Sequence, residues 1–143
     1  LPEERRRVLA EMRRREPRLA GRKVLIVDDD VRNIFSLASV LEQHQMEVLH
    51  AENGRDCIAL LEQTPDVDLV LMDVMMPEMD GYETMRSIRA RDRFKGLPII
   101  AITAKAMHGD REKCIQAGAS DYAAKPVDID QILSVLRVWL QRC

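Results

Sequence analysis

One stretch decides the fold of this chain: Val67-Asp68-Leu69-Val70-Leu71-Met72-Asp73-Val74-Met75-Met76-Pro77-Glu78-Met79-Asp80-Gly81-Tyr82. Its apolar residues continue almost without interruption up to Asp73, which is typical of a strand covered on both faces in a parallel sheet. Pro77 and Gly81 then mark a loop. Asp73 is therefore predicted at the carboxyl end of a buried strand, the edge where open α/β sheets place their functional groups.

From Lys23 onward, short apolar runs of this kind alternate with amphipathic segments. This alternation is typical of repeated βα units and a parallel sheet. We expect strands at 24–27, 46–50, 69–73, 98–103 and 120–124, and helices at 31–43, 53–64, 80–90, 110–117 and 128–141. The predicted architecture is a doubly wound α/β domain over residues 23–143, with a five-stranded parallel sheet and five helices.

Residues 1–22 are predicted to form a separate helical connector, because Pro2 suits a first helical turn and Pro17 ends the helix. The segment 1–23 carries a net charge of +5, so the remainder of a chain whose net charge is −2 carries −7. A linker is the favoured interpretation, and a basic arm that binds nucleic acid or membrane stays open. The acidic remainder argues against a nucleic-acid surface on the domain itself.

The overall composition is that of one compact domain: 143 residues, of which 46% are hydrophobic and 32% charged. Three cysteines without CxxC spacing favour reduced thiols in a cytoplasmic protein. No apolar run has membrane-spanning length and no signal peptide is visible, so membrane contact by this domain is not expected. The chain starts without Met, and we expect it to be a fragment of a longer protein.

Polar residues lie at the carboxyl ends of four of the predicted strands, and the carboxyl ends of parallel strands share one edge of the sheet. They are Asp28, Asp29 and Asp30 after the first strand, Asp73 at the end of the third, Thr103 at the end of the fourth and Lys125 after the fifth. Carboxylates gathered around one point repel each other unless a cation lies among them. Oxygen ligands without clustered His or Cys suit Mg²⁺, or Mn²⁺.

A hydroxyl and an ammonium group at the same edge suit phosphoryl oxygens, which Thr103 and Lys125 would contact. A carboxylate nucleophile, a metal ion, a hydroxyl and a lysine together describe the formation of an aspartyl phosphate. The sequence therefore predicts phosphoryl transfer to an aspartate as the chemistry of this edge.

Residues 23–140 resemble the receiver domain of two-component response regulators. The motifs that carry the resemblance are Val27-Asp28-Asp29, Asp73 with Met76-Pro77 and Met79-Asp80-Gly81, Thr103-Ala104, and Tyr122 with Lys125-Pro126. They occur in order and at predicted strand ends. The resemblance implies a flavodoxin-like fold of the CheY type.

The resemblance also implies residue roles: Asp73 as phosphoacceptor, Asp29 as a direct Mg²⁺ ligand, Asp28 as a ligand through water, the Met75 carbonyl as a further ligand, Thr103 and Lys125 on the phosphoryl oxygens, and Tyr122 as an aromatic that changes rotamer with Thr103. It implies self-phosphorylation from a phosphohistidine, slow hydrolysis and a switched interaction surface. The implied partner is a histidine kinase dimerisation domain or a histidine phosphotransfer protein, and a homodimer is possible.

Three stretches, 28–33, 109–113 and 125–128, look more like the receivers of hybrid sensor histidine kinases than like regulators with a DNA-binding domain. The basic connector before Lys23 is compatible with a kinase core upstream. A stand-alone regulator, or a receiver separated from another output domain, stays open.

Two other functions compete with this interpretation. A haloacid dehalogenase-type phosphohydrolase would use Asp28 as nucleophile and Asp30 as acid and base, but Arg32 is unusual there and Asp73 would be unexplained. A pseudo-receiver would only bind partners.

Individual residues also have plainer interpretations. Asp30 is expected to cap a helix, Tyr122 could be an ordinary half-buried aromatic, and Met72, Met75, Met76 and Met79 are expected to serve packing rather than soft-metal binding. Trp139 is expected in the core or on a partner surface.

Overall fold

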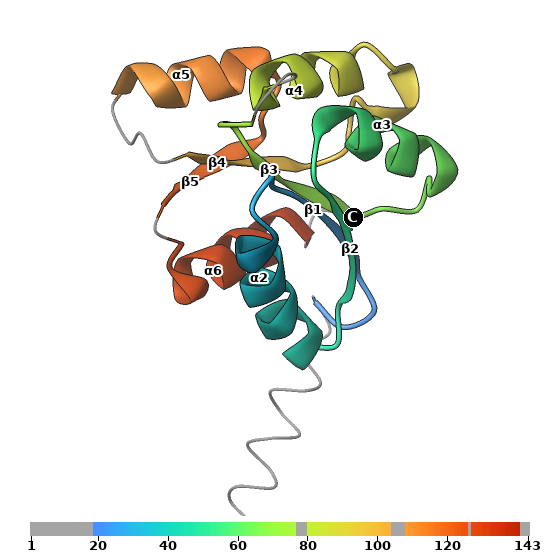
Figure 1. Cartoon of the computed structure of the whole chain (residues 1–143), viewed down its shortest axis with the longest axis vertical. Helices are drawn as coiled ribbons and strands as arrows, with labels where there is room; N and C mark the ends of the chain where they lie inside the picture. The colour runs from blue at the N-terminus through green and yellow to red at the C-terminus, as the bar shows by residue number, and fades with distance from the viewer. Residues whose placement is uncertain (1–18, 77–79, 104–107, 126, 141–143) are drawn as a thin grey trace, which may run out of the picture.

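The sheet has five parallel strands in the order β2-β1-β3-β4-β5, which is the flavodoxin-like arrangement (Figure 1). The computed structural model describes residues 19–76, 80–103, 108–125 and 127–140. The strands are β1 (Lys23–Val27), β2 (Glu47–Ala51), β3 (Leu69–Asp73), β4 (Ile99–Thr103) and β5 (Asp121–Ala124). The predicted doubly wound five-stranded sheet is therefore confirmed, while the predicted helix at 1–16 lies outside the described residues.

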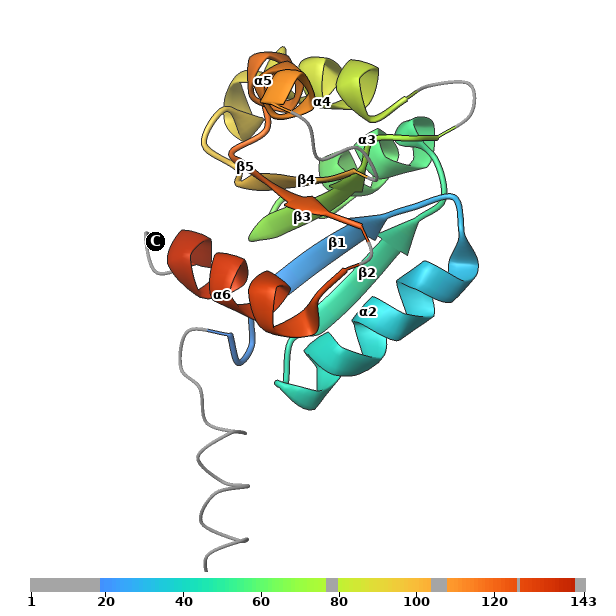
Figure 2. The same cartoon turned by 90° about the vertical axis from the view of Figure 1, so that its left-hand side faces the viewer.

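Helices cover both faces of this sheet (Figures 1 and 2). They are α2 (Val31–Gln43), α3 (Gly54–Gln63), α4 (Gly81–Arg89), α5 (His108–Ala117) and α6 (Ile129–Leu140), with a short 3-10 helix, η1, at Asp92–Phe94. Helices α2 and α6 pack on one face, and α3, α4 and α5 on the other. All five residues of β3 are buried, as expected for a central strand between two layers.

Short polar side chains cap the N-termini of α2, α3 and α4. Asp30 accepts the Arg32 backbone N–H, Asn53 accepts that of Asp56, and Asp80 accepts that of Glu83. Helix α5 ends at Ala117 as predicted, and Gly118, with φ of 118°, follows it.

Several predicted ends were wrong by one or two residues. Strand β4 begins at Ile99 rather than at Pro98, because proline has no N–H for the sheet ladder. Helix α4 begins at Gly81, since Asp80 is its cap, and the described part of α6 begins at Ile129, after the Asp128 carboxylate that accepts the Asp130 N–H. Cys57 lies in α3 and Cys114 in α5, and both are free, buried cysteines.

Arg89, at the end of α4, connects this helix by hydrogen bonds to η1 and to the turn between α5 and β5. Its Nε donates to the Gly118 carbonyl at 2.8 Å, Nη1 to the Phe94 carbonyl at 2.7 Å, and Nη2 to Ser120 Oγ at 3.3 Å. Burial lowers the pKa of this guanidinium, although it stays charged at neutral pH.

Replacing Arg89 with Ala is expected to lower the free energy of unfolding by about 2–4 kcal/mol, because the partly buried hydrogen bonds to the Gly118 and Phe94 carbonyls lose their charged donor. Urea denaturation measures the loss, with Arg86→Ala, an exposed change on the same helix, as the control. Equal stability of the two variants would show that water replaces the Arg89 donors without cost.

Candidate functional site

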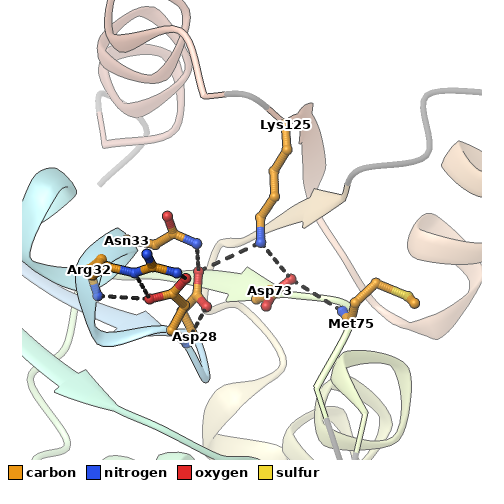
Figure 3. A network of polar contacts seen from close by, with 7 residues as sticks. Asp28, Arg32, Asn33, Asp73, Met75 and Lys125 are labelled. Carbon is orange, nitrogen blue, oxygen red and sulfur yellow. Dashed lines mark hydrogen bonds and ion pairs between the residues drawn. The ribbon is translucent and has the colours of Figure 1, made fainter.

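Asp28, Asp73 and Lys125 meet at the carboxyl ends of β1, β3 and β5 (Figure 3). Lys125 Nζ lies 3.2 Å from Asp73 Oδ1 and 3.7 Å from Asp28 Oδ2. Both carboxylates are buried, with exposures of 4% for Asp28 and 2% for Asp73. The structure therefore brings two buried acids and one base to a single point, from segments far apart in the sequence.

Backbone and side-chain donors hold the two buried carboxylates. The Asp30 amide donates to Asp28 Oδ1 at 2.8 Å, and Asn33 Nδ2 donates to Asp28 Oδ2 at 3.3 Å. The Met75 amide donates to Asp73 Oδ1 at 3.2 Å. Sequence reasoning missed Asn33 as a site residue. Its place in the first turn of the helix that follows the acidic loop is the signal that could have found it.

Three carboxylates are arranged in a way that suits a divalent cation. Asp28, Asp29 and Asp73 each offer an oxygen, and these oxygens all lie within 4.8 Å of one another. Asp29 is exposed, so the cluster opens to solvent on one side. A set of hard oxygen donors of this kind fits Mg²⁺. The ligand role of the Met75 carbonyl stays a prediction.

The predictions for Asp30 and for the methionines were only partly confirmed. Asp30 caps α2 as expected, and its carboxylate pairs with the Arg32 guanidinium at 3.1 Å, which lowers its pKa. Met72 and Met76 are buried as expected, whereas the Met75 side chain is 57% exposed, so the packing prediction for it was wrong. Met75 follows the end of β3 and lies between Val74 and Met76, which are both buried, so the three residues after the strand do not share one environment. Met79 lies outside the described residues.

Burial and the neighbouring charge of Asp28 raise the pKa of Asp73 from its ordinary 3.8 to about 6. Lys125 and the Met75 amide act in the opposite direction, but they do not cancel these two effects. A bound cation would favour the ionised carboxylate, so the acidic cluster fits cation binding electrostatically.

The metal-free domain is expected to lose stability as the pH rises from about 4 to about 6, by as much as about 3 kcal/mol. In that window the folded state keeps a proton on Asp73 that the unfolded state has already released, because burial raises the pKa of Asp73 to about 6. Urea denaturation in EDTA at a series of pH values measures the loss. Added Mg²⁺ should restore stability above pH 6, and a flat profile in EDTA would contradict the prediction.

Thr103 and Tyr122, the two predicted switch residues, lie on the neighbouring strands β4 and β5. Thr103 is buried at the end of β4, and its carbonyl accepts the Lys125 N–H at 2.8 Å. Tyr122 is half-buried and packs against the core on the α3–α5 face, with the Arg111 guanidinium 5.6 Å from its ring centroid. Trp139 packs against the other core, as predicted, and donates to Asp121 Oδ2 at 3.1 Å.

A cavity of about 230 Å³ adjoins the acidic cluster between α2 and the start of α6. Its lining consists of Asp28, Asn33, Ser36, Leu37, Ile102, Lys125, Val127 and Ile129. The end formed by Asp28, Asn33 and Lys125 belongs to the site, and apart from Ser36 the rest of the lining is apolar. Ile129 is 42% exposed, so the apolar side reaches the surface.

Residues 24–137 match the family model described as the response regulator receiver domain. This chain belongs to the receiver domain family. The receiver domain is 35% identical over 137 residues to hybrid signal transduction histidine kinase L of Dictyostelium discoideum, covering 92% of this chain and 8% of that protein. It is 36% identical over 118 residues to protein PilH of Pseudomonas aeruginosa, covering 82% of this chain and 97% of PilH. It spans only 8% to 14% of the length of the histidine kinases it matches.

Solved structures give the same family. The receiver domain of sensor histidine kinase PA1611 from Pseudomonas aeruginosa, determined with magnesium in its active site cleft, has 36% identity and a TM-score of 0.78, with 85% of this chain and 99% of that chain covered. The receiver domain of Ssk1, in complex with the histidine phosphotransfer protein Ypd1 of Saccharomyces cerevisiae, has 27% identity and a TM-score of 0.79, with 85% and 90% covered. In the described part of this receiver domain, no helix combines the length and apolarity that crossing a bilayer requires.

Proposed function

We propose that this receiver domain accepts a phosphoryl group on Asp73 from a phosphohistidine, in a reaction that depends on Mg²⁺. The observation that carries the proposal is the convergence of three carboxylates with Lys125, whose Nζ lies 3.2 Å from Asp73 Oδ1. A buried carboxylate beside a cation site and a lysine is suited to a nucleophile whose product carries more negative charge.

In the transfer, a carboxylate oxygen of Asp73 attacks phosphorus and forms an acyl phosphate P–O bond. The P–N bond to the donor imidazole breaks, and its electron pair returns to the imidazole nitrogen, which can then take a proton. Asp28, Asp29 and Asp73 would hold Mg²⁺, which would supply positive charge against the phosphoryl oxygens. Lys125 and the Thr103 hydroxyl would bind those oxygens, and slow attack by water would restore the Asp73 carboxylate.

Phosphorylation would be communicated to the surface through Thr103 and Tyr122. The two residues lie on paired strands, since Thr103 aligns with Ala124 and Tyr122 with Ala101. A Thr103 side chain drawn toward a phosphoryl group would change the packing available to the half-buried Tyr122 ring. Such a shift between two surface states is how local charge events produce a global response.

We propose that the domain that carries the phosphohistidine docks at the cavity between α2 and α6. Its polar end includes Asp28 and Lys125, and its apolar side reaches the surface at Ile129. A partner helix seated there would bring its histidine to the acidic cluster. The partner would be a histidine kinase dimerisation domain or a histidine phosphotransfer protein, and a homodimer stays a prediction.

A hybrid histidine kinase is the proposed parent protein. Support comes from relatives such as hybrid histidine kinase L, in which a matching segment occupies a small part of a long chain. The match to almost the whole of PilH keeps a stand-alone regulator as the alternative. Residues 1–22 would be the connector to the preceding domain, and the receiver domain would begin at residue 23.

Incubation with acetyl phosphate and Mg²⁺, followed by intact-mass measurement and peptide mapping, tests the proposed function. We expect one phosphoryl group per chain, on Asp73. A label on Asp28 would support the dehalogenase-type alternative, although Asp30, its required acid, is held by Arg32. A folded domain that binds neither beryllofluoride nor a phosphoryl group would support a pseudo-receiver.

A further inference from the structure

We propose that Asn33 is a positioning residue for metal binding, which acts by fixing the orientation of the Asp28 carboxylate. The inference rests on the proposed function, because it assumes that the acidic cluster binds Mg²⁺. Figure 3 shows the Asn33 amide turned toward Asp28 from the first turn of α2, on the side of Asp28 that borders the cavity. Asp28, which accepts the Asn33 hydrogen bond, is one of the three residues whose carboxylate oxygens could hold the cation.

The hydrogen bonds to Asp28 divide between its two oxygens. Oδ1 accepts the Asp30 amide at 2.8 Å, and Oδ2 accepts Asn33 Nδ2 at 3.3 Å. A carboxylate held at both oxygens cannot rotate freely about its Cβ–Cγ bond. Its remaining lone pairs are therefore presented in a constant direction toward Asp29 and Asp73, whose oxygens complete the cluster.

Lys125 also approaches Asp28 Oδ2, at 3.7 Å, but it lies closer to Asp73 Oδ1, at 3.2 Å. In the proposed reaction its ammonium turns to the phosphoryl oxygens and is no longer available to Asp28. Asn33 then keeps a side-chain donor on Oδ2 through the whole cycle. The geometry separates the two tasks, with Lys125 serving the phosphoryl group and Asn33 serving the metal ligand.

A neutral amide suits this position better than a cationic side chain would. A lysine or arginine would hold Asp28 equally well, but its charge would repel a divalent cation a few ångströms away. An amide offers a donor dipole without net charge, so it orients the carboxylate and leaves the negative potential of the cluster available to Mg²⁺.

The test measures Mg²⁺ binding to the whole chain by titration calorimetry, for wild type, Asn33→Leu and Asn33→Ala. Leucine keeps the branched shape of asparagine and removes the donor, while alanine removes both the branch and the donor. We expect the Kd for Mg²⁺ to rise about tenfold in both variants, as for other residues that orient metal ligands. Ser39→Ala, an exposed change on the same helix, should leave the Kd unchanged and serves as the control.

A second measurement separates positioning from general structural damage. With acetyl phosphate as donor, no partner protein is present, so a role of Asn33 in docking does not contribute. The Mg²⁺ concentration for half-maximal phosphorylation should rise by the same factor as the Kd, while the rate at saturating Mg²⁺ stays within about twofold of wild type.

The possible outcomes distinguish the two proposals. Wild-type Mg²⁺ affinity in both folded Asn33 variants would overturn the role of Asn33 and leave the proposed function intact. A lower rate at saturating Mg²⁺ with unchanged affinity would also overturn it. Failure of the wild-type chain to bind Mg²⁺ or to be phosphorylated would instead overturn the proposed function.

Discussion

Replacing Asp73 with Asn is expected to abolish phosphorylation and, at the same time, to make the metal-free domain more stable. The amide lacks the nucleophilic oxygen of a carboxylate, so acetyl phosphate should add no mass to the chain. Burial and the charge of Asp28 raise the pKa of Asp73 to about 6, which means that the folded state disfavours its ionised form. Removing the charge should therefore raise the free energy of unfolding at neutral pH by about 1–3 kcal/mol.

The gain in the free energy of unfolding is not expected to exceed about 3 kcal/mol. In the variant, Lys125 loses its partner at 3.2 Å and the new amide must find its own hydrogen bonds. Urea denaturation in EDTA measures it, and the pH dependence between about 4 and 6 should flatten in the variant. Asp92→Asn, at an exposed residue paired with Lys95, is the matched control and should change neither property. Full labelling of Asp73→Asn would identify another acceptor, and a loss of stability would contradict the repulsion between Asp73 and Asp28.

Replacing Gly81 with Ala is expected to damage both the fold and the site. Gly81 begins α4, and its N–H donates to the Val74 carbonyl at 3.0 Å, which closes the loop that follows Asp73. A Cβ there would lie 2.5 Å from the Asp73 carbonyl oxygen and 2.6 Å from the Val74 Cα. Main-chain atoms cannot rotate away as a side chain does, so the loop or the end of β3 must move.

Overpacking of this kind is expected to lower the free energy of unfolding by about 2–3 kcal/mol. Because the movement displaces Asp73 relative to Lys125, phosphorylation by acetyl phosphate should also slow by about 10- to 100-fold. Gly96→Ala is the matched control, since a Cβ at that exposed glycine meets nothing within 4 Å. If Gly81→Ala were as stable and as active as Gly96→Ala, the loop would have to accommodate the methyl group without moving Asp73.

The fold and much of the candidate site could be predicted from local patterns. Apolar runs and amphipathic segments have different periods, so the order of strands and helices was readable, including β3 with its exact ends. Parallel strands place their carboxyl ends at one edge, and this rule brought Asp28, Asp73 and Lys125 together in the prediction before any contact was known. Element ends were less predictable, because a proline or a capping side chain moves them by a residue.

Other features depend on distances between segments that no local pattern encodes. Asn33 could be recognised as a partner of Asp28 only once the first turn of α2 was placed against the end of β1. The exposure of Met75 and the contacts of Arg89 with distant carbonyls have the same origin.

The sequence by itself determined which residues gather at the carboxyl edge, because strand period and parallel pairing are local rules. Only the tertiary structure decided how those residues act on one another. The raised pKa of Asp73 and the closeness of Gly81 to its backbone both arise from burial and packing between segments. Interaction energies of this kind change steeply over a few ångströms, and that distance is set by how the whole core packs.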